Sequence, residues 1–459
     1  MTLLPPEFLS ALAMHFNAED YRCDPADCWV YGYDNSRRHA LPQAVVFAQN
    51  EQQIQTLVKL CYQYEVPLVA RGLGSGTPGG AVPIQGGVVL SFERMARIIE
   101  LDVANRLMVV EPGITNQAVQ EAAKQAGFFW PPDPTSSAYC TIGGNLSYNS
   151  AGPRAVKYGT PRENTLGLHA ITGEGELIKT GVYTTKGVVG YDLTRLIIGS
   201  EGTLAIIIQA TLKLTPLPPI KRTLQALYTD IHSATQAVIA LMSQPIIPCA
   251  IEFMDHTAIQ LVQSYSSLPI PEQTQALLMI EVDGDEASID NTYNTICKIA
   301  NREGCLLIRQ ATTAKEIAEL WQMRKSLSPA LRTLAPKKIN EDVVVPIANL
   351  GYLVEGSMAL AKKHDITIVN FGHAGNGNIH VNLLVDSDNP QEMERAHHCL
   401  HAIFDLVLSL NGTLSGEHGI GLEKQPFIRK ELSESVISLM QKIKTQFDPK
   451  NILNPGKIW

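Results

Sequence analysis

Arg71-Gly-Leu-Gly-Ser-Gly-Thr-Pro-Gly-Gly80 is the stretch on which the fold assignment depends. The run PLVAR at 67–71 predicts a strand that leads into it, and residues 51–64 before that run carry apolar side chains at helical spacing. AVVFA at 44–48 predicts an earlier strand, so a strand–helix–strand unit precedes the loop. A tight turn between strands needs one or two glycines, whereas residues 72–80 contain five. The loop is therefore interpreted as a binding loop.

The loop does not fit a Rossmann dinucleotide site. That site requires a helix directly after its glycines, and this loop instead runs into Pro78, Pro83 and a further strand. Backbone N–H groups flanked by Ser75 and Thr77 can still bind an anion without a helix. A pyrophosphate is the natural ligand for such a nest.

Composition limits the possible classes of protein. The chain has 459 residues, 45% of them apolar, which favours two or more folded domains. Its formal net charge of -8 argues against nucleic acid as a partner. Eight cysteines without a CxxC pair indicate neither an iron–sulfur cluster nor a disulfide framework. No signal peptide and no membrane-spanning run is evident, so we expect a cytoplasmic location.

The pattern of predicted elements indicates an α+β protein with three segments. Residues 1–219 hold an N-terminal helix and a first α+β domain, and the prolines of TPLPP at 215–219 mark its end. Residues 220–410 form a second α+β domain, in which we expect helices near 286–302, 313–335 and 391–410. Residues 411–459 form a closing segment.

Two further glycine-rich stretches follow the first loop. TIGGNLSYNSAG at 141–152 comes after PPDP at 131–134, and GSEGTL at 199–204 precedes a strand. With KYG at 157–159 and GYDL at 190–193, the order resembles the PCMH-type FAD-binding domain of the vanillyl-alcohol-oxidase superfamily. The resemblance implies that FAD contacts come from Arg71, Gly72, Leu73, Gly74, Ser75, Gly76, Thr77, Pro132, Asp133, Gly143, Gly144, Asn145, Ser150, Gly152, Glu201, Gly202 and Ile206.

Within that superfamily the chain is most similar to the branch of D-lactate dehydrogenase, the glycolate oxidase flavin subunit and D-2-hydroxyglutarate dehydrogenase. The resemblance covers nearly the whole chain and implies a C-terminal cap domain that binds substrate. Members with covalent flavin carry a histidine in or near the first loop, and residues 71–83 contain none. Non-covalent FAD is therefore implied.

A second group of candidate functional residues lies in the C-terminal half. FGHAGNGNIHVN places His373 and His380 on either side of a glycine-rich turn between two predicted strands, and SGEHGIG adds Glu417 and His418. Two imidazoles and a carboxylate are a typical ligand set for a divalent metal with open positions. By resemblance, His373, His380 and Glu417 bind zinc or manganese, and His418 is the catalytic base.

Candidate substrate-binding residues lie near these motifs. Trp321-Gln-Met-Arg324 falls in a predicted helix, and the family motif WxxR favours Arg324 as the ligand of the substrate carboxylate. Ser328 lies one turn later on the same helix face. Asn382 should share a strand face with His380. If the substrate carries a second carboxylate, Lys337 and Lys338 are the nearby cations that would bind it.

The resemblance implies an FAD-dependent, metal-assisted dehydrogenase of a small D-2-hydroxy acid. Electrons would pass to an electron-transfer flavoprotein, a quinone or a cytochrome. The resemblance is compatible with peripheral association with a membrane through that acceptor, and with a homodimer. Two alternatives stay open, namely an oxidase for an aromatic alcohol or sugar, and a non-catalytic flavoprotein subunit. Neither accounts for all of His373, His380, Glu417 and His418.

Overall fold

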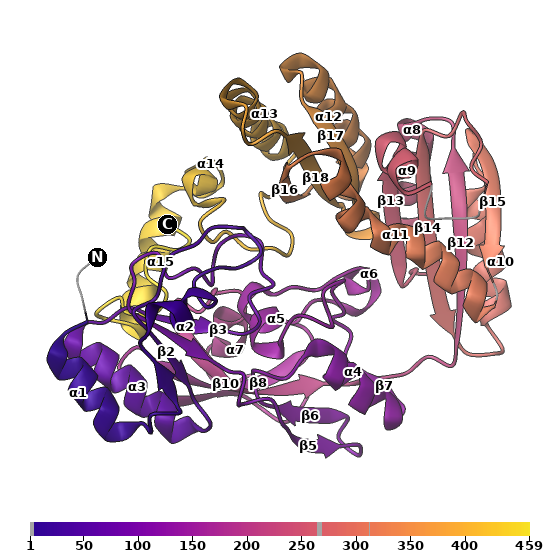
Figure 1. The fold of residues 1–459 in the computed structure, drawn as a ribbon. Helices are drawn as coiled ribbons and strands as arrows, with labels where there is room; N and C mark the ends of the chain where they lie inside the picture. Colours follow the sequence, from indigo (N-terminus) through magenta and orange to yellow (C-terminus); the bar gives the residue numbers. More distant parts are fainter. Residues whose placement is uncertain (1–3, 264–268, 312) are drawn as a thin grey trace. The chain divides into compact units, whose positions relative to one another are not determined.

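A computed structural model of the chain describes residues 4–263, 269–311 and 313–459. The chain folds into two compact units (Figure 1). The first comprises Met1–Ala151, Gly159–Leu217 and Glu417–Trp459, and the second comprises Gly152–Tyr158 and Pro218–Gly416. The α+β class expected from the sequence is confirmed. The chain passes from the second unit back to the first between Gly416 and Glu417.

The first unit contains the predicted strand–helix–strand arrangement as β2, α3 and β3. Its four-stranded sheet has the order β1-β2-β4-β3, in which β2, β4 and β3 are parallel and β1 is antiparallel. Helix α3 (Glu51–Tyr64) buries its apolar stripe in the same core as β3, and the Asn50 side chain caps its N-terminus. The strands are β1 (Tyr21–Arg22), β2 (Ala44–Phe47), β3 (Leu68–Arg71) and β4 (Val88–Ser91).

A five-stranded antiparallel sheet forms the rest of the first unit's framework, in the order β5-β6-β10-β8-β9. Its long strand β10 is the predicted closing strand and is almost wholly buried. The strands are β5 (Ile98–Asp102), β6 (Leu107–Val110), β8 (Thr165–Thr172), β9 (Leu177–Gly181) and β10 (Ala205–Lys213), with a separate pair β7 (Phe128–Phe129) and β11 (Thr215–Pro216).

The first unit's helices are mostly short. Besides α3, they are α1 (Pro6–His15), α2 (Pro25–Trp29), α4 (Asn116–Gln125), α5 (Ile142–Tyr148), α7 (Leu193–Ile197), η4 (Gln425–Phe427), α14 (Ile428–Glu431) and α15 (Glu434–Phe447).

The second unit is built on a seven-stranded antiparallel sheet in the order β15-β12-β14-β13-β17-β18-β16. The tight turn predicted between His373 and His380 is confirmed as the short helix η3 (Ala374–Asn376), which joins β17 to β18. The strands are β12 (Ile220–Tyr228), β13 (Ala250–Asp255), β14 (Ala276–Gly284), β15 (Cys305–Ala311), β16 (Lys337–Val344), β17 (Thr367–His373) and β18 (Asn378–Val385).

Helices cover both faces of this sheet. The side chains of α11 (Ala314–Leu334) share a core with Phe371 and Leu384 on one face. Asn370, which alternates with Phe371, points to the opposite face and contacts Ser357 of α12 (Leu350–His364). The remaining helices are α6 (Ala155–Tyr158), α8 (Ile231–Met242), α9 (His256–Val262), α10 (Ile289–Ala300), η2 (Ile347–Asn349) and α13 (Pro390–Ser409). Among the described helices, none is long and apolar enough to span a membrane.

A buried cation ties α15 to the rest of the first unit. The Lys444 ammonium donates to the Thr203 and Leu453 carbonyls and forms an ion pair with Asp448. Removing one partner of a buried pair leaves the other charge uncompensated. We expect Lys444→Ala to lower the free energy of unfolding by about 3–5 kcal/mol in urea denaturation. The exposed Lys442 on the same helix is the control, and a Lys442→Ala change as large as that of Lys444→Ala would contradict this explanation.

Candidate active site

The three glycine-rich stretches of the first unit meet around helix α5. Thr141 caps this helix by accepting a hydrogen bond from the Gly144 N–H, and Gly72 of the first loop packs against the Thr141 hydroxyl. From the third stretch, the Gly199 and Glu201 N–H groups donate to carbonyls of the same helix. A short helix thus brings together segments that are far apart in sequence.

The PPDP stretch joins this group through a residue that sequence reasoning missed. The amide of Asn116 donates to the Pro132 carbonyl at 3.0 Å and to Asn145 Oδ1 at 3.0 Å. The Asp133 N–H donates to the Ala151 carbonyl. Asn116 is fully buried at the start of α4. A polar residue directly after the N-cap Thr115 is common at the start of a helix, so the sequence did not indicate that Asn116 connects these segments.

Within the first loop, Arg71 is the buried member. Its Nη1 donates to the Tyr33 carbonyl at 2.6 Å, and burial lowers the pKa of its guanidinium. Gly74 has φ +68 and lies directly over this guanidinium, so a side chain there would be displaced by it. Leu73 is exposed, and Ser75 and Thr77 are half-buried.

Glu201 connects the third stretch to the C-terminal segment. Its carboxylate accepts the Ile420 N–H at 2.6 Å and the Gly421 N–H at 2.8 Å. Burial raises the pKa of Glu201 to about 7, and these two hydrogen bonds oppose the rise. The neighbouring predicted contacts are Gly202, at φ +70, and Ile206, which is buried on β10.

The SGEHGIG segment is held on the first unit's side by residues of α5 and the turn after it. The Ser150 hydroxyl donates to the Glu417 carbonyl at 3.0 Å, and Gly419 packs against the ring of Tyr148. Glu417 and His418 are both half-buried. Gly152, the last residue of the second glycine stretch, belongs to the second unit.

In the second unit, His373 and His380 lie at the turn between β17 and β18. Both are buried, and their ring centroids are 5.3 Å apart. His373 is on the same sheet face as Glu252 of β13, because the two residues are paired across the strands. The turn predicted from sequence therefore places both imidazoles on one face.

Each imidazole has its Nδ1 turned toward a buried carboxylate. Glu252 Oε1 lies 2.5 Å from His373 Nδ1, and Asp342 Oδ1 lies 3.8 Å from His380 Nδ1. Burial would raise the pKa of Glu252, but His373 and Arg324 outweigh it and hold the pKa at about 2. A carboxylate hydrogen-bonded to Nδ1, as Glu252 is to His373, fixes the orientation of the imidazole ring, whereas the 3.8 Å between Asp342 and His380 exceeds hydrogen-bond distance. The sequence analysis did not identify Glu252 or Asp342. An acidic residue inside an otherwise apolar strand could have indicated a buried carboxylate with a specific partner.

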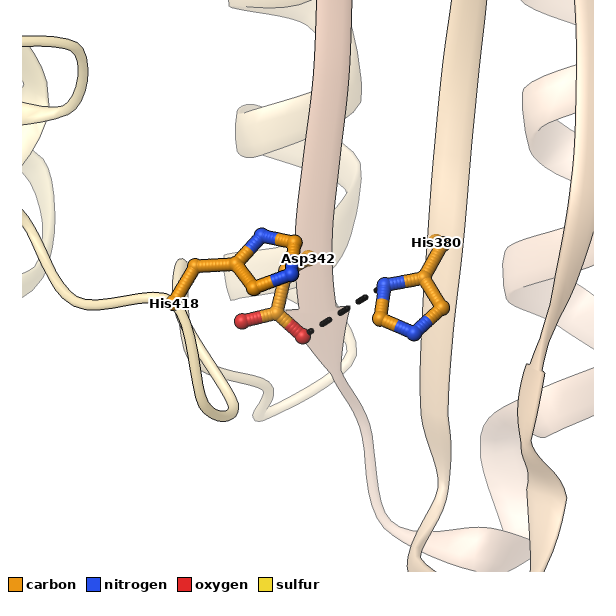
Figure 2. Close-up of side chains that lie close together, drawn as sticks. All are labelled: Asp342, His380 and His418. Atoms are coloured by element: carbon orange, nitrogen blue, oxygen red, sulfur yellow. Dashed lines mark ion pairs between the residues drawn. The ribbon is translucent and has the colours of Figure 1, made fainter. Parts of the chain in front are cut away.

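Asp342 also holds the chain just before Glu417. Its Oδ2 accepts the Gly416 N–H at 2.9 Å, and its Oδ1 accepts from Asn378 at 2.7 Å. Figure 2 shows Asp342 and His380 on neighbouring strands with their ion pair, and labels His418, which follows Gly416 by two residues in the chain. Asp342 thus holds the last residue of the second unit, which precedes Glu417 in the chain.

The Trp321-Gln-Met-Arg324 motif is docked on the same sheet face. Arg324 Nε donates to Glu252 Oε2 at 2.5 Å, its guanidinium lies 4.9 Å from the centre of the Phe371 ring, and the residue is 7% exposed. The indole of Trp321 donates to Glu281 at 3.0 Å. Arg324 is therefore a buried residue and not a surface arginine.

The other two predicted substrate-binding residues are Ser328 and Asn382. Ser328 is exposed on α11 and accepts a hydrogen bond from Lys338 at 3.1 Å. Asn382 lies two residues after His380 on β18 and is fully buried. Its amide donates to the Val369 and His380 carbonyls, while its Oδ1 has no hydrogen-bond partner among the described residues.

Comparisons with known proteins agree with this arrangement. Residues 217–458 match the model for the C-terminal domain of FAD linked oxidases, and residues 42–181 match an FAD binding domain. The chain belongs to the FAD-linked oxidase family. The protein is an FAD-dependent oxidoreductase, and its fold is the PCMH-type FAD-binding fold with a C-terminal FAD-oxidase domain.

Three relatives match most of the length of this chain. Glycolate oxidase subunit GlcD of Bacillus subtilis is 39% identical over 431 residues, 94% of this chain and 92% of the relative. D-lactate dehydrogenase of Archaeoglobus fulgidus is 34% identical over 444 residues, which are 95% of this chain and 96% of the relative. The mitochondrial D-lactate dehydrogenase [cytochrome] of Arabidopsis thaliana is 32% identical over 460 residues, which are 99% of this chain and 80% of the relative.

A solved structure shows the same fold at lower identity. Substrate-bound p-cresol methylhydroxylase superposes with a TM-score of 0.80 at 18% identity, over 99% of this chain and 97% of that chain. At that identity the likeness concerns the fold alone.

The contact between Gly72 and Thr141 gives a test of the flavin site. A Cβ at position 72 would lie 2.3 Å from Thr141 Oγ1, so Gly72→Ala must move the first loop or the cap of α5. We expect the FAD content, measured by absorbance and after heat release, to fall several-fold while the second unit stays folded. Gly284→Ala, whose Cβ would meet its neighbours only at 3.6 Å, is the control. Full FAD content in Gly72→Ala would contradict the assignment.

Proposed function

We propose that this protein is a dehydrogenase that converts a D-2-hydroxy acid of the D-lactate or D-2-hydroxyglutarate class to the 2-oxo acid and passes the hydride to non-covalent FAD. The relatives named D-lactate dehydrogenase support the substrate class. The observation that carries the proposal is the sheet face of the second unit, where two buried histidines with carboxylate partners lie beside a buried arginine.

The ligand set fits a divalent metal. We infer that His373, His380 and Glu417 hold zinc or manganese, since two imidazoles and a carboxylate leave positions open for a substrate. When bound, the metal lowers the pKa of the substrate hydroxyl and the flavin accepts the hydride at N5. The absence of histidine from residues 71–83 supports a flavin without a covalent link.

The chain's own residues then bind the substrate and move one proton. Arg324 keeps both Nη groups for the substrate carboxylate, because among the described residues only its Nε has a hydrogen-bond partner. Asn382 and Ser328 are further substrate contacts in this proposal. His418 takes the hydroxyl proton, a role that imidazole performs near neutral pH.

Glycolate is the second candidate substrate. It is favoured by the 39% identity to glycolate oxidase subunit GlcD, and it needs the same residues because it is also a 2-hydroxy acid. Because that relative is named as a subunit, an assembly with other subunits is also compatible with this proposal. A non-catalytic subunit is disfavoured, because His373, His380, Glu417 and His418 are all present.

We further propose that the reduced flavin is reoxidised by an electron-transfer flavoprotein, a quinone or a cytochrome. The name of the Arabidopsis relative supports a cytochrome. Peripheral association with a membrane would follow from a quinone acceptor, and a homodimer is compatible with this function.

The substrate class is tested by anaerobic bleaching of the flavin. D-lactate, D-2-hydroxyglutarate, D-malate and glycolate are compared with the L-enantiomers of the chiral acids. A substrate held by both its carboxylate and its hydroxyl presents the C2 hydrogen in one direction only, so we expect strong preference for D-forms. EDTA treatment should abolish bleaching while the flavin stays bound. Equal D and L rates, or full activity of metal-free protein, would overturn the proposal.

The adjacent residues Glu417 and His418 should give different phenotypes. Neighbours on an extended segment point in opposite directions, so one can meet the metal while the other meets the substrate. We expect His418→Ala to keep FAD and metal and to slow flavin reduction roughly 10²- to 10⁴-fold. Glu417→Ala should lose metal, measured by elemental analysis. The reverse pattern would exchange the two roles.

A further inference from the structure

One buried carboxylate touches two residues that the proposed function assigns to different tasks. Glu252 lies on β13 in the middle of the seven-stranded sheet and is 1% exposed. Its Oε1 faces His373 Nδ1 and its Oε2 faces Arg324 Nε, each at 2.5 Å. His373 is an expected metal ligand, and Arg324 is the expected ligand of the substrate carboxylate.

The hydrogen-bond roles follow from the chemistry of the three groups. An ionised carboxylate only accepts, and a guanidinium only donates. His373 must therefore carry its hydrogen on Nδ1, which leaves the Nε2 lone pair for a metal. Arg324 is fixed through Nε, so the plane of its guanidinium and the direction of its two Nη groups are set by the same carboxylate.

We propose that Glu252 is a positioning residue that sets the metal-binding histidine and the substrate-binding arginine relative to each other. The inference rests on the proposed function and adds a residue to it. A 2-hydroxy acid carries its hydroxyl and carboxylate on adjacent carbons, so the metal and the arginine must lie at one fixed spacing to bind both. A rigid bridge through one carboxylate provides such a spacing.

The neighbouring Glu281 offers a matched control. It is a buried carboxylate on the same sheet face, since it pairs with Ala250, two residues before Glu252. It anchors α11 through the Trp321 indole and also meets Thr223. Its contacts therefore secure the helix without reaching His373 or Arg324 directly.

The test compares Glu252→Gln, Glu281→Gln and Arg324→Ala in the FAD-loaded protein. Metal affinity is measured by competition with a chromophoric chelator for Zn²⁺ and Mn²⁺, and KM and kcat are measured with the acid that bleaches the wild-type flavin. A glutamine offers one acceptor oxygen and cannot accept from both partners as Glu252 does. We expect Glu252→Gln to weaken metal binding roughly 10- to 100-fold and to raise KM.

The two controls separate positioning from stability. Glu281→Gln should leave metal affinity within about twofold, because its carboxylate contacts no metal ligand. Arg324→Ala should raise KM but keep metal affinity, since the contact between Glu252 and His373 survives. The KM effects of Glu252→Gln and Arg324→Ala should be less than additive in the double variant, because the part of the Glu252→Gln effect that acts through Arg324 is then already lost.

Several outcomes would overturn the inference. Unchanged metal affinity in Glu252→Gln would do so, as would an equal loss in Glu281→Gln. If Glu252→Gln does not fold, Glu252→Asp replaces it: aspartate keeps the charge but is too short to reach both partners, so metal affinity or KM must still change. A wild type that binds metal but oxidises no 2-hydroxy acid would refute the proposed function alone, and the metal-affinity comparison would still decide the role of Glu252.

Discussion

The peptide bond between Gly416 and Glu417 is the constraint on which the proposed site depends. The N–H of Gly416 is held by Asp342 of the second unit, and the carbonyl of Glu417 is held by Ser150 of the first. Glu417 and His418 therefore follow directly after the point where the chain leaves the second unit for the first. The metal ligand and the base that we propose at these two positions are joined through the chain itself to Gly416, which Asp342 holds.

The sheet face of the second unit carries charge at positions where a stable sheet would carry apolar residues. Glu252, Glu281 and Asp342 are each buried in strands. Such groups cost free energy unless every oxygen has a donor, and here the donors are a histidine, an arginine, an indole and backbone N–H groups. These polar groups are better explained by the chemistry they orient than by stability.

The sequence predicted the elements that depend on local pattern, and missed the contacts that depend on register. The turn between His373 and His380 was visible because two glycines, Gly375 and Gly377, lie between the two histidines. The partner of His373 lies 121 residues away and the partner of Arg324 lies 72 residues away, both at Glu252. No local pattern fixes which strands become neighbours in an antiparallel sheet, so the bridge became visible only with the strand order.

The same limit explains the contacts of Glu201. Its motif predicts a flavin contact, and the structure shows that its carboxylate accepts two N–H groups of the segment 420–421, two residues beyond His418. The left-handed backbone at Glu201, φ 54, turns the chain so that its own N–H binds α5 while its side chain reaches this segment. One residue of a flavin-binding motif thus also orders the loop that carries the proposed base, which couples folding of the flavin unit to placement of His418.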